Sequence, residues 1–128
     1  MTEVVAAALI VMGVAIAAVW TRDIVVGEQI DLGAGLMRAR DPDAGTLMWP
    51  HWLAEYTTAA ALVVSGVGLI ADADWAVVVG SAAAGALLYT SVNSLAWALA
   101  EPSRRPYRYP MLAGAVVGIV AIAVLVLR

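Results

Sequence analysis

The residues with the most chemical potential lie on one face of a predicted helix. Four polar residues follow one another at intervals of four, three and seven: His51, Glu55, Thr58 and Ser65. Such intervals place side chains on one face of an α-helix. A carboxylate at the centre of an apolar membrane helix costs about 2.5–3.5 kcal/mol to insert, unless it is paired, protonated or wetted. Glu55 is therefore a candidate functional residue.

A second polar face is predicted in the apolar segment that follows. Gly85, Tyr89 and Asn93 repeat every four residues. Only Asp72-Ala73-Asp74 separates the two segments, so the second must return antiparallel beside the first. Asn93 and Glu55 then lie at similar depth, ~7–10 Å from the end of the span at ~1.5 Å per residue. We predict a ligand or ion site formed by five residues: His51, Glu55, Thr58, Tyr89 and Asn93.

Helix packing gives an alternative interpretation of Glu55 and Asn93. A hydrogen bond between two membrane helices is worth about 0.6–2 kcal/mol, which is enough to retain a polar pair that only holds the helices together. The residue pattern supports the site and the packing interpretations equally.

A metal site is a further interpretation of His51 and Glu55, because bundle sites use ligands spaced along one helical face. A metal needs three or four protein ligands, whereas the chain has one His and no Cys. We therefore predict no metal and no cofactor, which leaves open only a metal shared across an oligomer axis. No serine stands in a nucleophile motif. We predict no catalytic residue and favour a protein that is not an enzyme.

The composition is that of a membrane protein. Hydrophobic residues make up 63% and charged residues 13% of the chain, against about 45–50% and about 25% in soluble domains. The apolar residues fall in four blocks long enough to span a bilayer: residues 4–20, 52–71, 75–100 and 111–127. We predict an all-α integral membrane protein with four transmembrane helices in a compact bundle, the second and third forming a tight hairpin. Residues 1–128 form a single transmembrane domain.

The first block has a rival interpretation as a secretory signal peptide, because Ala15-Ile16-Ala17 offers an A-x-A cleavage pattern. A signal peptide needs a basic segment before its apolar core, and the chain starts with Met1-Thr2-Glu3. A retained span is favoured.

The arginines indicate an orientation. All seven basic residues are Arg, and six lie in the predicted loops 21–50 and 101–110: Arg22, Arg38, Arg40, Arg104, Arg105 and Arg108. The positive-inside rule places both loops in the cytoplasm and both termini outside the plasma membrane. Trp20 and Trp52 fall at the same interface, where amphipathic rings sit at headgroup depth. The net charge of −3 with no basic face argues against nucleic-acid binding.

Small residues indicate where helices pack closely. Gly114 and Gly118 form a GxxxG pattern, and Ser81 and Gly85 a similar pair; such pairs let helix backbones approach. We expect the GxxxG face to join separate subunits. The predicted function is a homo-oligomeric channel or carrier for a small ion or solute, with its polar site around Glu55. The alternative is a non-enzymatic auxiliary or structural subunit of a larger membrane complex.

The orientation can be tested with single cysteines, because the chain has no native Cys. Ser103→Cys lies in the second arginine-containing loop, so it should resist an impermeant thiol reagent added to intact cells. Asp74→Cys, between the second and third blocks, is the matched control and should be labelled. Labelling of Ser103→Cys in intact cells would contradict the arginine argument.

Overall fold

A computed structural model of the chain describes residues 1–26, 30–31, 38–39, 42–100 and 102–127. Four long helices account for most of them: α1 Thr2–Val26, α2 Pro42–Ile70, α3 Ala76–Ala100 and α4 Arg108–Val126. A short 3-10 helix, η2 (Pro102–Tyr107), joins α3 to α4. Two-residue strands, β1 (Ile30–Asp31) and β2 (Arg38–Ala39), pair antiparallel between α1 and α2.

Each long helix contains a stretch that is long and apolar enough to cross a membrane. The four stretches are Thr2–Arg22, Pro50–Ile70, Ala76–Ala100 and Arg105–Val126. The described part of the chain is thus a helical protein with four candidate membrane spans, as the composition predicts.

The predicted loop over residues 21–50 needs correction, because it is helical at both of its ends. Helix α1 continues to Val26, and α2 begins at Pro42. Proline fits the first turn of a helix because its missing N–H would have no partner there. By this criterion the helix could begin at either Pro42 or Pro50, and in the structure it begins at Pro42. Pro50 consequently lies inside α2, where its missing N–H removes one backbone hydrogen bond.

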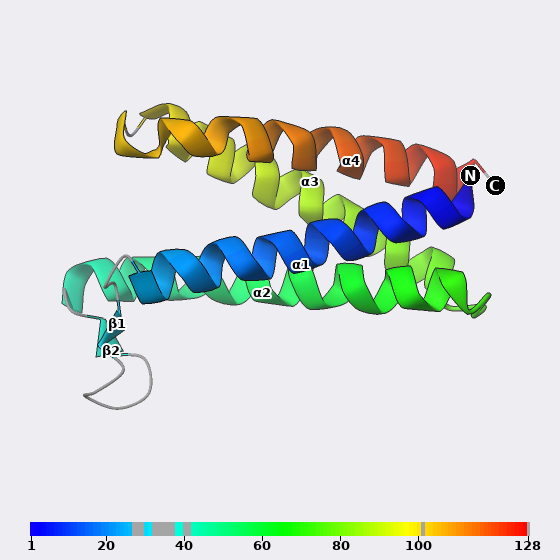
Figure 1. The fold of residues 1–128 in the computed structure, drawn as a ribbon, viewed down its shortest axis with the longest axis horizontal. Coiled ribbons are helices and arrows are strands. Elements are labelled where there is room, and N and C mark those ends of the chain that lie inside the picture. The colour runs from blue at the N-terminus through cyan, green and yellow to red at the C-terminus, as the bar shows by residue number, and fades with distance from the viewer. Residues whose placement is uncertain (27–29, 32–37, 40–41, 101, 128) are drawn as a thin grey trace.

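The helices run up and down with neighbouring helices antiparallel (Figure 1). Helix α1 packs along α2, α3 packs along α4, and the two pairs meet mainly through α2 and α3. Both termini lie at the same end as the α2–α3 turn, and β1, β2 and η2 lie at the opposite end (Figure 1). We call these the termini end and the loop end.

The turn between α2 and α3 closes without glycine. Asp72 has a left-handed backbone (φ 50°). The Ala73 amide donates to the Gly68 carbonyl at 2.9 Å and the Asp72 amide to the Leu69 carbonyl at 3.4 Å. These are the two bonds of a Schellman cap, in which Asp72 takes the place usually held by glycine. The cap satisfies the last carbonyls of α2 and reverses the chain into α3.

Two glycines bring α1 and α2 into backbone contact. A Cβ built on Gly13 would lie 2.6 Å from the Ala59 carbonyl oxygen, and one built on Gly66 would lie 2.7 Å from the Ala6 carbonyl oxygen. Real Cβ atoms do not fit at such distances. Glycine at these two positions is therefore required for the observed spacing of α1 and α2.

The GxxxG face of α4 packs inside the chain, which corrects the expected contact between subunits. Gly114 and Gly118 are buried. A Cβ on Gly114 would collide with the Ser91 hydroxyl, and one on Gly118 would lie 3.0 Å from the Ala84 carbonyl oxygen. Both glycines thus face α3. A small-residue pattern identifies a face of close packing but says nothing about which helix covers it.

Substitution of these glycines should destabilise the single chain. Gly114→Leu or Gly118→Leu overpacks the α3–α4 contact, which typically costs about 1–3 kcal/mol. Ala113→Leu, at an exposed position of α4, is the matched control. Thermal unfolding in mild detergent measures the difference, and equal midpoints for Ala113→Leu and Gly114→Leu would contradict the assignment.

Candidate functional site

The polar face of α2 points toward the other helices. Glu55 is 3% exposed, Thr58 5% and Ser65 0%. Their helical spacing puts these three residues on one buried face of α2. Residues on its other faces, such as Leu53, Val64 and Val67, are exposed. The carboxyl group of Glu55 is therefore enclosed by protein rather than by lipid or water.

Side chains from three helices meet at the Glu55 carboxyl group. The Ser94 hydroxyl on α3 donates a hydrogen bond of 3.2 Å to Oε1, and the Trp20 indole on α1 is a second hydrogen-bonding neighbour. His51, one turn earlier on α2, places its Nε2 3.7 Å from the same oxygen. This arrangement ties α1, α2 and α3 to a single acidic group.

The predicted contributions of Tyr89 and Asn93 need correction. Tyr89 is 72% exposed, and Asn93 is also exposed. They share one face of α3 as predicted, but that face points outward. Ser94, the residue after Asn93, is rotated by about 100° around the helix and takes the position expected for Asn93.

The inner face of α3 carries three hydroxyl groups that the sequence analysis did not select. Thr90, Ser91 and Ser94 are 5–6% exposed and follow Leu87 at intervals of three, four and seven residues. Thr90 donates to the Leu87 carbonyl at 3.2 Å, the usual role of a hydroxyl in an apolar helix.

Trp20 and Trp52 face the helix interior rather than the outer surface of the helices. They are 6% and 3% exposed and pack together with Ile24. The Trp20 ring also meets the His51 ring edge to face, with centroids 4.9 Å apart and an interplanar angle of 79°. Indole rings thus pack in the loop end of the helix interior, with that of Trp20 against His51.

A small cavity of about 50 Å³ lies beside Glu55. All four long helices contribute to its walls, and its polar lining comes from Glu55, Thr90 and Ser91, with Trp20 alongside. A cavity can hold one water molecule when the volume open to a water-sized sphere is at least about 10–15 Å³. The carboxyl group therefore has room for water next to it.

The geometry provides one acidic group, one histidine and hydroxyl groups. Within the part of the chain that the structure describes, no three His, Cys, Asp or Glu residues gather as a metal site would require. The arrangement can hold a proton or a small cation at the carboxyl group, or it can hold helices together.

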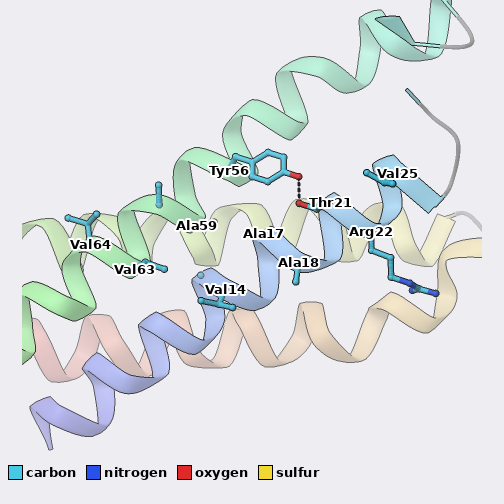
Figure 2. A pocket seen from close by; sticks show the side chains of 12 residues that line it. Val14, Ala17, Ala18, Thr21, Arg22, Val25, Tyr56, Ala59, Val63 and Val64 are labelled. Carbon is cyan, nitrogen blue, oxygen red and sulfur yellow. Dashed lines mark hydrogen bonds between the residues drawn. The ribbon is translucent and has the colours of Figure 1, made fainter. Parts of the chain in front are cut away.

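A larger hollow lies on the outside of the molecule, between α1 and α2 (Figure 2). Its volume is about 940 Å³, and Glu55 does not line it. Near its loop end the hydroxyls of Thr21 and Tyr56 are 2.7 Å apart. We refer to this hollow as the α1–α2 groove; its lining residues are Gly13, Val14, Ala17, Ala18, Thr21, Arg22, Val25, Tyr56, Ala59, Ala60, Val63 and Val64.

Comparison with known proteins does not identify the chain further: no family model, no curated protein and no solved structure matches it. The fold and site thus define a class of protein only, a helical protein with four candidate membrane spans and a buried acidic residue.

The bond between Ser94 and Glu55 can be measured by a double-mutant cycle. Ser94→Ala should lower stability, because it removes a donor from a buried carboxyl group, and it should have little effect when Glu55 is already Leu. We expect a coupling of about 0.6–1.7 kcal/mol, the range for such bonds in membrane proteins. Asn93→Ala, on the outer face, is the control. An equal loss from Asn93→Ala, or additive effects of the two substitutions, would contradict the geometry.

Proposed function

We propose that the chain is a subunit of a homo-oligomeric channel or carrier for a small ion, in which the Glu55 carboxyl group binds the ion. One observation carries the proposal: an acidic side chain only 3% exposed within a stretch apolar enough to cross a membrane. Retaining a buried carboxyl group there is costly, and such groups commonly mark ion or proton pathways.

The surroundings of Glu55 favour a proton or a monovalent cation as the ion. His51, the residue that pairs with Glu55 among those the structure describes, balances the carboxylate only when it is protonated. The His51 side chain is 18% exposed and that of Glu55 only 4%. The pair therefore offers a route by which a proton enters from the loop end, and the water-sized cavity beside Glu55 extends this route inward.

An oligomer is part of the proposal because the cavity beside Glu55 has a volume of only about 50 Å³. A second copy has a surface to use on α3. A Cβ built on Gly85 would meet nothing within 4 Å, and Ser81 on the same face uses its hydroxyl locally, donating to the Val77 carbonyl at 2.8 Å. Close helix contact is easiest at such small residues.

The membrane and the orientation also belong to the proposal: the plasma membrane, with both termini outside. Of the arginines that the structure describes, five lie near the loop end (Figure 1): Arg22 in the last turns of α1, Arg38 in β2, Arg104 and Arg105 in η2, and Arg108 at the start of α4. The positive-inside rule assigns that end to the cytoplasm.

An auxiliary or structural subunit of a larger membrane complex is the second candidate. The hydrogen bond from Ser94 to Glu55 favours it, because this bond joins α3 to α2 as a packing role requires. The Ser81 and Gly85 face would then meet a larger partner instead of a second copy.

Flux through reconstituted vesicles distinguishes the two candidates. Glu55→Gln should abolish proton- or cation-dependent flux and leave thermal stability nearly unchanged, since glutamine keeps the volume and hydrogen-bonding capacity of glutamate. Glu3→Gln, at an exposed position of α1, is the matched control and should transport normally.

Normal flux in Glu55→Gln would remove Glu55 from the transport proposal. Absence of H⁺, Na⁺ and K⁺ flux in the unmodified protein would instead favour the auxiliary subunit.

A further inference from the structure

The α1–α2 groove opens on the loop-end side of the backbone contacts between the two helices. The contact between Gly13 and Ala59 is the one nearer that end. Figure 2 shows α2 rising away from α1 beyond this point, with Tyr56 and Thr21 bridging the gap. Small side chains such as Ala17, Ala18 and Ala60 leave the hollow between the two helices unfilled.

We propose that the α1–α2 groove binds an anionic phospholipid, with one acyl chain along the groove and the phosphate at Arg22. This assignment is independent of transport at Glu55. It rests on three features of the groove: its length, its charge and the hydroxyl pair at its loop end.

The length of the groove matches one membrane leaflet. Its α1 wall runs from Gly13 to Val25, and Arg22 lies nine residues after Gly13. Nine residues of α-helix rise about 13–14 Å, close to half of the ~30 Å hydrocarbon core. Gly13 then lies near the middle of the membrane and Arg22 near its surface. An acyl chain entering from the surface therefore reaches the closed end of the groove.

The charge of the groove favours an anionic headgroup. Arg22 is exposed and is the one charged residue among those that line the groove. Its guanidinium group extends away from α1, on the side opposite the Thr21–Tyr56 bond (Figure 2). Arginine binds phosphate through paired, charge-assisted hydrogen bonds. A headgroup phosphate thus meets a cation at the membrane surface.

The hydroxyl pair supplies a further donor. The hydroxyl oxygens of Thr21 and Tyr56 are 2.7 Å apart, and one of the two hydroxyl groups donates a hydrogen bond to the other. Each hydroxyl group carries one hydrogen, so one of the two remains to donate to an ester or phosphate oxygen of the lipid. A helix from a second copy would instead have to bring an acidic side chain to Arg22 or leave that charge unpaired.

Native mass spectrometry of the purified full chain in mild detergent tests the proposal. Phosphatidylglycerol and phosphatidylcholine with identical acyl chains are added at equal concentration, and the bound lipid is counted. We expect preferential retention of phosphatidylglycerol. Arg22→Gln should lower this retention roughly tenfold, the effect of losing one charge-assisted contact, and bring it to the level of phosphatidylcholine.

Arg108→Gln is the matched control. Arg108 is exposed on α4, where it lies over the Tyr109 ring at 4.6 Å, outside the groove, so retention should not change. Ala60→Leu fills the groove and should lower retention of both lipids; Ala18→Leu, on the α1 wall, replaces it if Ala60→Leu does not fold. Thermal unfolding in lipid-free detergent checks the fold of each variant.

Three results would overturn the proposal. The first is equal retention of the two lipids, or equal effects of Arg22→Gln and Arg108→Gln. The second is binding of glycerol 3-phosphate as tight as that of phosphatidylglycerol, because a free phosphate would then occupy Arg22 without the groove. The third is efficient disulfide formation between copies of Ala18→Cys in membranes, because a second copy would then fill the groove.

Discussion

Close contact between helix backbones is the constraint on which the rest of this structure depends. Lipid tails are as apolar as the side chains, so membrane helices gain little by burying hydrophobic surface and associate through tight packing. Here Gly13 and Gly66 bring α1 against α2, and Gly114 and Gly118 bring α4 against α3. The contact at Gly114 also fixes the rotation of α3, since it requires Ser91 to face α4. Once Ser91 faces inward, Ser94 does so as well and meets Glu55.

The helix interior is consequently divided along its length. Leucines and alanines fill the termini end, where Leu9, Leu69 and Leu125 belong to one buried cluster. The loop end contains the Glu55 carboxyl group, the small cavity and the indole rings of Trp20 and Trp52. Polar groups near one surface can exchange with water on that side while the other end stays closed. This asymmetry suits a site that is loaded from the loop end.

The sequence was sufficient to predict the four spans and the inward face of α2. Long apolar runs identify the spans by length. The polar residues His51, Glu55 and Thr58 stand at helical spacing among apolar neighbours, which indicates one polar face on α2. The rotation of α3 was not predictable in this way. Its outer face, with Tyr89 and Asn93, and its inner face, with Ser94, both show helical spacing, and both lie among apolar residues. The inner face is selected by close contact with α4, which no pattern within α3 reports. For the same reason the GxxxG pattern predicted close packing but not which helix would be packed.

The partners of Glu55 suit both a carboxylate and a protonated carboxyl group, as the role proposed for it in ion transport requires. A carboxylate accepts hydrogen bonds, whereas a protonated carboxyl group must also donate one. Ser94 can satisfy both states, because its hydroxyl group donates to the carboxylate and can accept from the acid after rotating. The Trp20 indole can only donate, and a carboxyl oxygen can accept from it in either state. The site therefore accommodates gain and loss of a proton without movement of a helix. A purely structural bond between α2 and α3 would be made equally well by glutamine, which carries no desolvation cost for a charge. The carboxyl group at position 55 is thus the feature that packing alone leaves unexplained.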